Sequence, residues 1–178
     1  MSAGKYLRIR WEDFAKSELG VLQQNDHQIY FLEIEGEGGG PILWLNSGVE
    51  DLQTVLDSKA SSGPRAATRN ALFDSIAQPV WLALVMRAAR KFAEREEDDA
   101  GEPFESEGGG WEESVLATIA EEVFPDEESE KAVSDLAQGL SDPEQQVDLL
   151  QRVSLAVQRH LVLQKSTVAL LRALEAAG

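Results

Sequence analysis

The chain offers few residues whose type and spacing could carry out acid–base, nucleophilic or metal chemistry. It has no cysteine, which excludes thiolate metal sites and disulfides, and its two histidines are His27 and His160. Few acid–base partners lie within sequence range of either histidine. A structural role is therefore the favoured interpretation of both, with titration of His160 inside a helical bundle as the alternative.

The glycine-rich segment at 36–41 follows an apparent strand, as a phosphate-binding loop does. It leads into another apparent strand, however, and lacks the Lys-Ser/Thr pair of such loops. Without a helix N-terminus behind it, it also lacks the backbone N–H groups that bind anions. A loop between strands is the favoured interpretation. The triple glycine at 108–110 lies among acidic residues, which repel phosphate, and is interpreted as a linker.

Carboxylates are abundant, with 32 Asp and Glu residues in the chain. The runs at 96–99 and 126–130 lack the alternating ligands and the glycine of a calcium-binding loop. Nucleophilic serine motifs, Walker motifs, zinc spacings and dinucleotide fingerprints are also absent from the sequence. The sequence therefore predicts no enzyme, no metal site and no cofactor, although an active site can be assembled from unremarkable residues.

The net charge of −16 is distributed very unevenly. Residues 61–92 hold five basic residues and one acidic residue, whereas residues 93–130 hold one basic and sixteen acidic residues. The negative field favours basic partners and disfavours direct binding to nucleic acid or to an anionic membrane. Arg87, Arg90 and Lys91 end the basic segment, and they either pair with the acids that follow or form part of a binding surface.

The segment 1–46 has the pattern of strands. In residues 7–11, apolar side chains alternate with arginines at the period of a strand. Residues 28–35 are rich in β-branched and aromatic side chains, and residues 42–45 form a further apolar run. With a short segment around Val21 as another candidate, we expect an antiparallel sheet of three or four strands.

The segment 47–93 has the apolar spacing of helices. Ser47 and Glu50 match a capping box, which predicts that a helix begins there. The stretch 76–92 is apolar on every side in its first half, so we expect it to be the buried central helix of the core. Pro79 lies in its first turn and is expected to divide or kink it from a preceding helix.

Residues 94–110 are dense in negative charge and glycine, so they cannot bury enough apolar surface to offset the entropy of ordering. We expect an acidic mobile loop. Residues 111–178 return to helical spacing, and between Pro143 and Ala177 the sequence contains neither glycine nor proline. This predicts one long C-terminal helix, whose apolar residues form two seams at heptad spacing, as in a helix packed on several neighbours.

These patterns predict a single domain, residues 1–178, of a mainly helical α+β class. Its parts are a β-rich part at 1–46, helices at 47–93 that include the buried central helix, the acidic mobile loop at 94–110 and a helical part at 111–178. We therefore expect a small N-terminal antiparallel sheet of three to four strands, followed by a helical bundle with a long C-terminal helix.

The sequence favours a non-catalytic protein–protein interaction subunit of a larger, bacterial-type assembly, because it combines the absence of catalytic motifs with a long two-seamed helix. The partner would be a basic protein or, through the C-terminal helix, a second copy of the chain. One alternative is an acidic inhibitor, such as an immunity protein or a DNA mimic. A second is a nucleic-acid-associated accessory protein that binds through basic residues at 65–91. The chain shows neither a signal peptide nor an apolar run of ~20 residues, so we expect a cytoplasmic protein that binds no membrane.

Three groups of residues are the candidates for partner binding, because they are charged or belong to an apolar seam. The acidic group is Glu96, Glu97, Asp98 and Asp99. The basic group is Arg87, Arg90 and Lys91. The apolar group, on the predicted C-terminal helix, is Leu150, Val157, Leu161, Val168 and Leu171.

Overall fold

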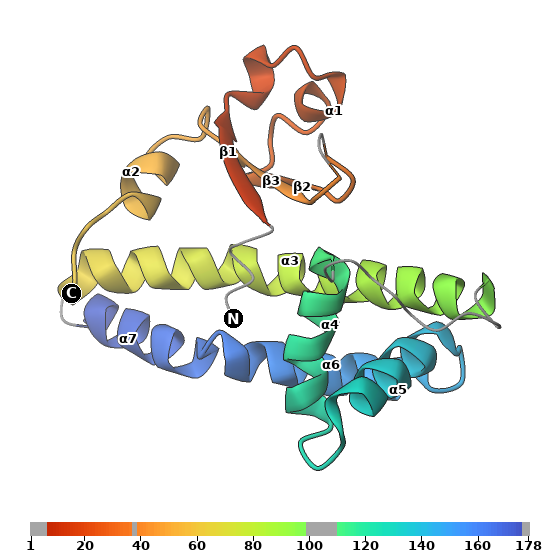
Figure 1. The fold of residues 1–178 in the computed structure, drawn as a ribbon. Coiled ribbons are helices and arrows are strands. Elements are labelled where there is room, and N and C mark those ends of the chain that lie inside the picture. The colour runs from red at the N-terminus through yellow and green to blue at the C-terminus, as the bar shows by residue number, and fades with distance from the viewer. Residues whose placement is uncertain (1–6, 37–38, 99–109, 176–178) are drawn as a thin grey trace. The chain divides into compact units, whose positions relative to one another are not determined.

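The computed structural model describes residues 7–36, 39–98 and 110–175 (Figure 1). This part of the chain is mainly helical and contains one small sheet, which confirms the predicted α+β class. The strands are β1 (Arg8–Glu12), β2 (Tyr30–Glu33) and β3 (Ile42–Asn46). The helices are the 3-10 turn η2 (Phe14–Lys16), α1 (Gly20–Gln23), α2 (Leu52–Leu56), α3 (Gly63–Asp98), α4 (Trp111–Val123), α5 (Ser129–Ser141), α6 (Gln146–His160) and α7 (Leu163–Glu175).

The described chain divides into two compact units. The sheet unit contains the described residues up to Ala77 together with those from Leu161 onward. The helical unit contains the described residues from Gln78 to His160. Helix α3 therefore belongs to both units, and the expectation of a single domain over 1–178 stays a prediction.

The sheet has the strand order β1-β3-β2, so the last strand in the sequence is central. β3 pairs in parallel with β1, with Ile42 opposite Arg8, and antiparallel with β2, with Leu45 opposite Tyr30. The sheet is mixed, and the expectation of an antiparallel sheet is therefore wrong in this respect. Alternation of apolar residues identifies strands but does not show which strands are neighbours. A simple meander would pair β1 with β2, whereas here β3 lies between them.

The segment around Val21, a candidate strand in the sequence, forms the short helix α1 instead. Packing explains the difference, because one helical turn places Leu22 completely inside the core while Val21 stays 45% exposed. Leu22 there joins Phe14 of η2, which is also completely buried. Over so few residues, an apolar pattern does not distinguish a strand from a single helical turn.

Strand β3 is buried along its whole length. Ile42 and Trp44 pack with the core residues of η2 and α1. Because side chains alternate along a strand, Leu43 and Leu45 point to the opposite face, and they are buried as well. Ile9 of β1, in contrast, is 52% exposed, as is common on the edge of a sheet.

A buried asparagine at the end of β3 connects several segments of the sheet unit. Asn46 is 1% exposed. Its side-chain oxygen accepts hydrogen bonds from the backbone N–H groups of Phe14 (3.2 Å) and Gly48 (2.9 Å). Its side-chain amide donates to the carbonyl oxygens of Asp26 (2.9 Å) and Gln28 (2.8 Å). These bonds use both donors and both acceptor positions of the side chain.

The capping box predicted at Ser47 and Glu50 does not form, and helix α2 begins only at Leu52. The side chain of Asn46 accepts a hydrogen bond from the N–H two residues further on, which turns the chain where the first helical turn was expected. Asp51 then precedes the helix in a left-handed conformation, with φ of 62° and no side-chain cap. Helix α2 is therefore shorter than predicted, because the side chain of Asn46 binds a backbone N–H group where the first helical turn was expected.

Helix α3 continues through Pro79, so the expected division of the helix at this residue is wrong. A proline removes the hydrogen bond to the carbonyl four residues earlier, here that of Ser75. Both residues lie on the exposed side of the helix, where water can replace the missing bond. Residues 94–98 of the expected acidic loop also belong to α3, and residues 99–109 lie outside the described part of the chain.

In the helical unit, α4, α5 and α6 pack against one another. Their completely or almost completely buried side chains include Leu116, Ile119, Leu136, Leu140, Val153 and Val157. Helix α3 adds Val80, Leu84 and Val85 to the buried residues. Leu82 and Met86 are only half-buried, so the predicted central helix is buried on one face and not on every side. Helices α5 and α6 approach closely at Gly139, where a Cβ atom would lie 2.2 Å from Cδ1 of Leu149.

The expected long C-terminal helix is two helices, because α6 ends at His160 and α7 begins at Leu163. Between them, Val162 adopts a left-handed conformation with φ of 56°. This conformation is unfavourable for a β-branched residue, and no glycine or proline in the sequence indicates the break. The break falls where the chain passes from the helical unit to the sheet unit, so packing within the units overrides local helix propensity.

Candidate functional site

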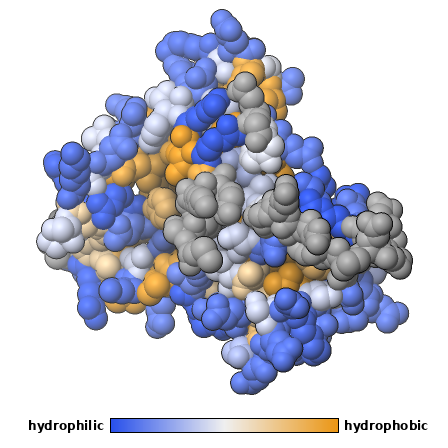
Figure 2. Space-filling view, viewed as in Figure 1, coloured by the Kyte–Doolittle hydropathy of each residue, from blue (hydrophilic) through white to orange (hydrophobic). Residues whose placement is uncertain are grey.

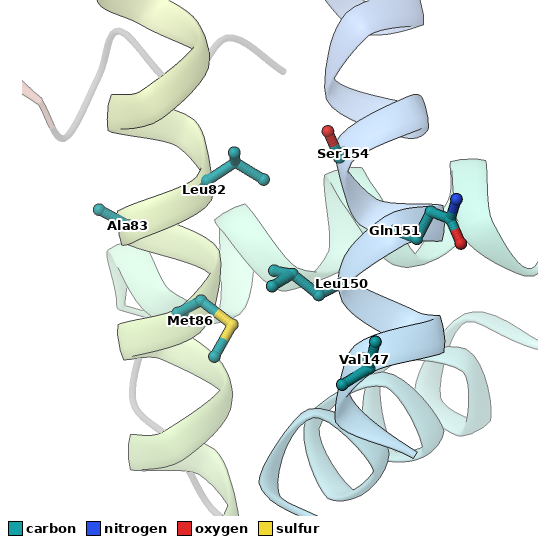
Figure 3. A pocket seen from close by; sticks show the side chains of 7 residues that line it. All are labelled: Leu82, Ala83, Met86, Val147, Leu150, Gln151 and Ser154. Atoms are coloured by element: carbon teal, nitrogen blue, oxygen red, sulfur yellow. The ribbon is translucent and has the colours of Figure 1, made fainter. Parts of the chain in front are cut away.

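An apolar groove lies between helices α3 and α6 of the helical unit (Figure 3). It has a volume of about 600 Å3, and its lining residues are Leu82, Ala83 and Met86 of α3 and Val147, Leu150, Gln151 and Ser154 of α6. Leu82 and Met86 extend from α3 toward α6, and Leu150 extends from α6 toward Met86. The groove is thus formed by apolar side chains that two helices direct toward each other.

The spacing of these residues follows from the helical repeat. Leu82 and Met86 are four residues apart, which places them one turn apart on the same face of α3. Val147, Leu150 and Ser154 recur at i, i+3 and i+7 on α6. A second stripe of α3 packs in the core, so this helix has two apolar faces, of which only one is completely buried.

The groove is open to solvent. Val147 is 74% exposed and Leu150 is 37% exposed, while the lining residues of α3 are half-buried. On the face shown in Figure 2, hydrophilic residues dominate the described surface and hydrophobic residues gather in a few places. No charged or imidazole side chain is among the described residues that line the groove, so it offers apolar contact together with the hydrogen-bonding groups of Gln151 and Ser154.

A second groove of the helical unit, of about 700 Å3, is polar and acidic. Its carboxylates belong to Asp135, Asp142, Glu144 and Asp148. Arg152, which also lines it, donates a hydrogen bond to the carbonyl oxygen of Val123 (2.6 Å) and lies over the ring of Phe124, 4.6 Å from the ring centroid. This cation therefore has partners within the protein, and the groove has a net negative charge.

Helix α6 contributes to both grooves, since Val147 lines the apolar groove and Asp148 lines the acidic one. Beside the acidic groove, hydrogen bonds to Asp135 and then to Glu127 raise the pKa of Lys131 above its usual value. Within the described part of the chain, no group of three or more His, Asp or Glu residues is placed to hold a metal ion.

The basic candidates Arg90 and Lys91 pair with acids of the protein itself. Arg90 forms an ion pair with Glu94 at 2.8 Å, one turn along α3. Lys91 forms an ion pair at 2.5 Å with Glu112 of α4, which is 7% exposed. Arg87 is half-buried on the same helix. The geometry therefore favours the interpretation in which the basic segment neutralises neighbouring acids, rather than the one in which it is offered to a partner.

The acidic candidates lie at the end of α3. Glu96, Glu97 and Asp98 are in its last helical turn, and Asp99 lies outside the described residues. A role for these four residues in partner binding stays a prediction.

The apolar candidates are divided between the two units, with Leu150 and Val157 in the helical unit and the other three in the sheet unit. Leu150 lines the apolar groove, whereas Val157 is completely buried, and its side chain therefore packs inside the protein instead of facing a partner. Leu161 is half-buried at the break between α6 and α7. Val168 and Leu171, on α7 in the sheet unit, are 39% and 55% exposed. Partner binding by Leu161, Val168 and Leu171 stays a prediction.

Sequence reasoning missed most of the groove. Leu82 and Met86 belong to a stretch that is apolar on every side, and this pattern predicts a completely buried helix. Val147 belongs to the same heptad seam as Leu150, and this seam was the available signal for the α6 side of the groove. The seam does not show which of its members are covered, and Val157 is covered while Val147 is not.

His160 has a structural contact, at the end of α6. Its ring packs against that of Trp81 of α3, with ring centroids 5.0 Å apart and an interplanar angle of 69°. This edge-to-face arrangement is favourable for aromatic rings and fits the structural interpretation of this histidine. His27 lies in the sheet unit, with Nδ1 3.6 Å from a carboxylate oxygen of Asp26.

Comparison of the chain with protein families, with curated proteins and with solved structures found no match. In the described part of the chain, no helix combines the length and the apolar character needed to cross a membrane. The function is therefore inferred from the residues and geometry of the grooves.

Proposed function

We propose that the protein is a non-catalytic interaction subunit of a larger protein assembly, and that it binds a protein partner through the apolar groove between α3 and α6. The proposal rests on the exposure of large apolar side chains in a preformed groove, with Val147 74% and Leu150 37% exposed. Single exposed apolar residues are common, but these two share one groove with Leu82 and Met86. Grouped apolar surface is typical of sites for protein partners.

The lining of the groove supports binding more than catalysis. Ser154 contributes a hydroxyl group, and a serine nucleophile needs a base within hydrogen-bond reach. His160, six residues further along α6, packs on Trp81 instead of lining the groove. An amphipathic helix needs only an apolar trough with polar groups beside it, which α3 and α6 provide.

Site-specific photo-crosslinking in a bacterial host tests the proposal. A photoreactive phenylalanine analogue at Val147 would report on the groove. The same analogue at Leu155, which is 51% exposed on α6 but does not line the groove, is the matched control. We expect discrete protein adducts at position 147 and not at position 155. Identical adducts at both positions, or none at either from a protein that is monomeric by light scattering, would refute the proposal.

An acidic inhibitor of a basic protein is the second candidate, and the acidic groove at α5 and α6 favours it. A mimic of phosphate groups needs carboxylates on ordered elements, and Asp135 and Asp148 lie on helices. Under this candidate, Glu144→Lys combined with Asp148→Lys should abolish inhibition, and Leu150→Lys should leave it unchanged. Assembly through a second copy of the chain, a cytoplasmic location and the absence of membrane binding stay predictions.

A further inference from the structure

The dimensions of the apolar groove indicate what kind of segment occupies it. The lining residues of α6 recur from Val147 to Ser154, which corresponds to about 10 Å along the helix axis. An amphipathic helix that presents side chains at i, i+3 or i+4, and i+7 covers the same length. An extended strand is disfavoured, because both walls are helices whose backbone N–H and C=O groups are bonded within the helix.

The charge of the helical unit indicates the chemistry of the partner. Residues 78–160 include twenty acidic and seven basic residues, a net charge of −13 out of −16 for the whole chain. At least five of the seven cations have carboxylate or carbonyl partners within the unit, and these include Arg90, Lys91, Lys131, Arg152 and Arg159. Glu144 and Asp148 are exposed on or next to the helix that carries Val147. The helical unit is therefore acidic as a whole, which favours a cationic partner.

We infer that the apolar groove binds a basic amphipathic helix of a partner protein. Its apolar face would contact Leu82, Met86 and Leu150, and its cations would lie beside Glu144 and Asp148. This inference rests on the proposed function and adds the chemical class of the partner. A second copy of the chain is disfavoured as the occupant, because a symmetric contact would bring two acidic units together. Nucleic acid is disfavoured because the acidic residues repel phosphate.

Met86, which lines the groove, provides a direct probe of this binding. In the whole protein with 13C-labelled methionine methyl groups, the NMR signal of Met86 reports on the groove. The probe ligand is a synthetic amphipathic peptide of about 18 residues, long enough for several helical turns, with leucine on one face and lysine on the other. A matched peptide has glutamate in place of every lysine.

We expect the lysine peptide to shift the NMR signal of Met86. At low salt it should bind at least about tenfold more tightly than the glutamate peptide, since attraction to the acidic unit becomes repulsion. Two variants with the same change in charge locate the contact. Leu150→Lys places a cation in the groove, and binding of the lysine peptide should weaken at least about tenfold. Leu155→Lys places the cation outside the groove, and binding should weaken less than about threefold.

Several results would overturn the inference. Equal affinity for the two peptides would show that charge plays no part, although the groove would remain a helix-binding site. Equal losses in Leu150→Lys and Leu155→Lys would place the contact outside the groove. Val147→Lys, at a position that is 74% exposed, replaces Leu150→Lys if that variant does not fold. Binding of neither peptide, together with crosslinked adducts at position 147, would refute the basic helix and leave the proposed function standing.

Discussion

Replacing Asn46 by alanine is expected to destabilise the sheet unit strongly, because the side chain is 1% exposed and satisfies four backbone groups. The substitution leaves the N–H groups of Phe14 and Gly48 and the carbonyl groups of Asp26 and Gln28 without these partners. None of the four backbone groups is removed by the substitution, so each must find water or remain unpaired in the folded state.

The magnitude follows from the burial of these groups. The hydrogen bond to Phe14 is buried, and a buried donor without an acceptor costs about 1–3 kcal/mol. The other three bonds are partly buried, and the loss of each costs about 0.5–1.5 kcal/mol. We therefore expect Asn46→Ala to lower the free energy of unfolding by about 2.5–7.5 kcal/mol, a large part of the stability of a typical domain.

Urea unfolding followed by circular dichroism measures this loss, and hydrogen exchange of peptides that cover β3 assigns it to the sheet unit. Asn25→Ala is the matched control, because the side-chain amide of Asn25 donates one exposed hydrogen bond to the carbonyl oxygen of Val21 (2.7 Å). We expect the control to lose less than about 1 kcal/mol. Similar losses in both variants would refute the role assigned to Asn46.

Asn46→Asp gives a pH-dependent version of the same test. The carboxylate keeps an acceptor for Phe14 and Gly48 but places its second oxygen against the carbonyl oxygens of Asp26 and Gln28. Burial and these carbonyls should raise the pKa of the introduced carboxyl above its unfolded value, so the variant loses stability as the pH rises above about 4. Relative to the wild-type protein, it should be less destabilised at about pH 4 than at about pH 7. Equal destabilisation at both pH values would contradict this geometry.

Three further predictions concern the ion pair, the close helix contact and the helix break. Lys91→Met should lower the thermal stability more than Glu112→Gln, because Lys91→Met leaves the buried carboxylate of Glu112 unpaired. In Glu112→Gln the unpaired group is the side chain of Lys91, which is 38% exposed and can be hydrated. The opposite order of stability would contradict the burial of this pair. Gly139→Ala should cost about 1–2 kcal/mol in urea unfolding, because its Cβ meets Leu149, and Leu149→Val should relieve part of this loss in a double-mutant cycle. Val162→Gly should stabilise the protein by about 0.5–1 kcal/mol by removing a β-branched residue from the left-handed region, and destabilisation would show that the residue is not strained there.

Much of the secondary structure could be predicted from the sequence, because residues close in sequence determine it. The period-two pattern and the apolar run at 42–45 correctly identified β1 and β3, and helical spacing correctly predicted a helical part after residue 110. The apolar stretch at 76–92 correctly predicted a helix with a buried face, but it also predicted burial on the side where Leu82 and Met86 are only half-buried. The charge imbalance is also a property of the sequence, and it is the basis for expecting a basic partner.

The neighbours of each element could not be predicted in this way. Strand alternation shows which face is apolar but not that β3 lies between β1 and β2. Asparagine is common in turns, so the sequence does not indicate that Asn46 has a buried structural role. Only the folded chain brings Phe14 and Gln28 to its side chain. Likewise, the absence of glycine and proline predicted one C-terminal helix, yet packing places a break at Val162.

The candidate site shows the same division between local pattern and tertiary structure. The sequence alone determined that α3 and α6 carry apolar stripes, because the helical repeat places Leu82 beside Met86 and Val147 beside Leu150. Only the tertiary structure decided which apolar residues are covered, because burial depends on the side chains that other elements bring to each face. It buried Val157 completely and left Val147 74% exposed in the groove on which the proposed function depends.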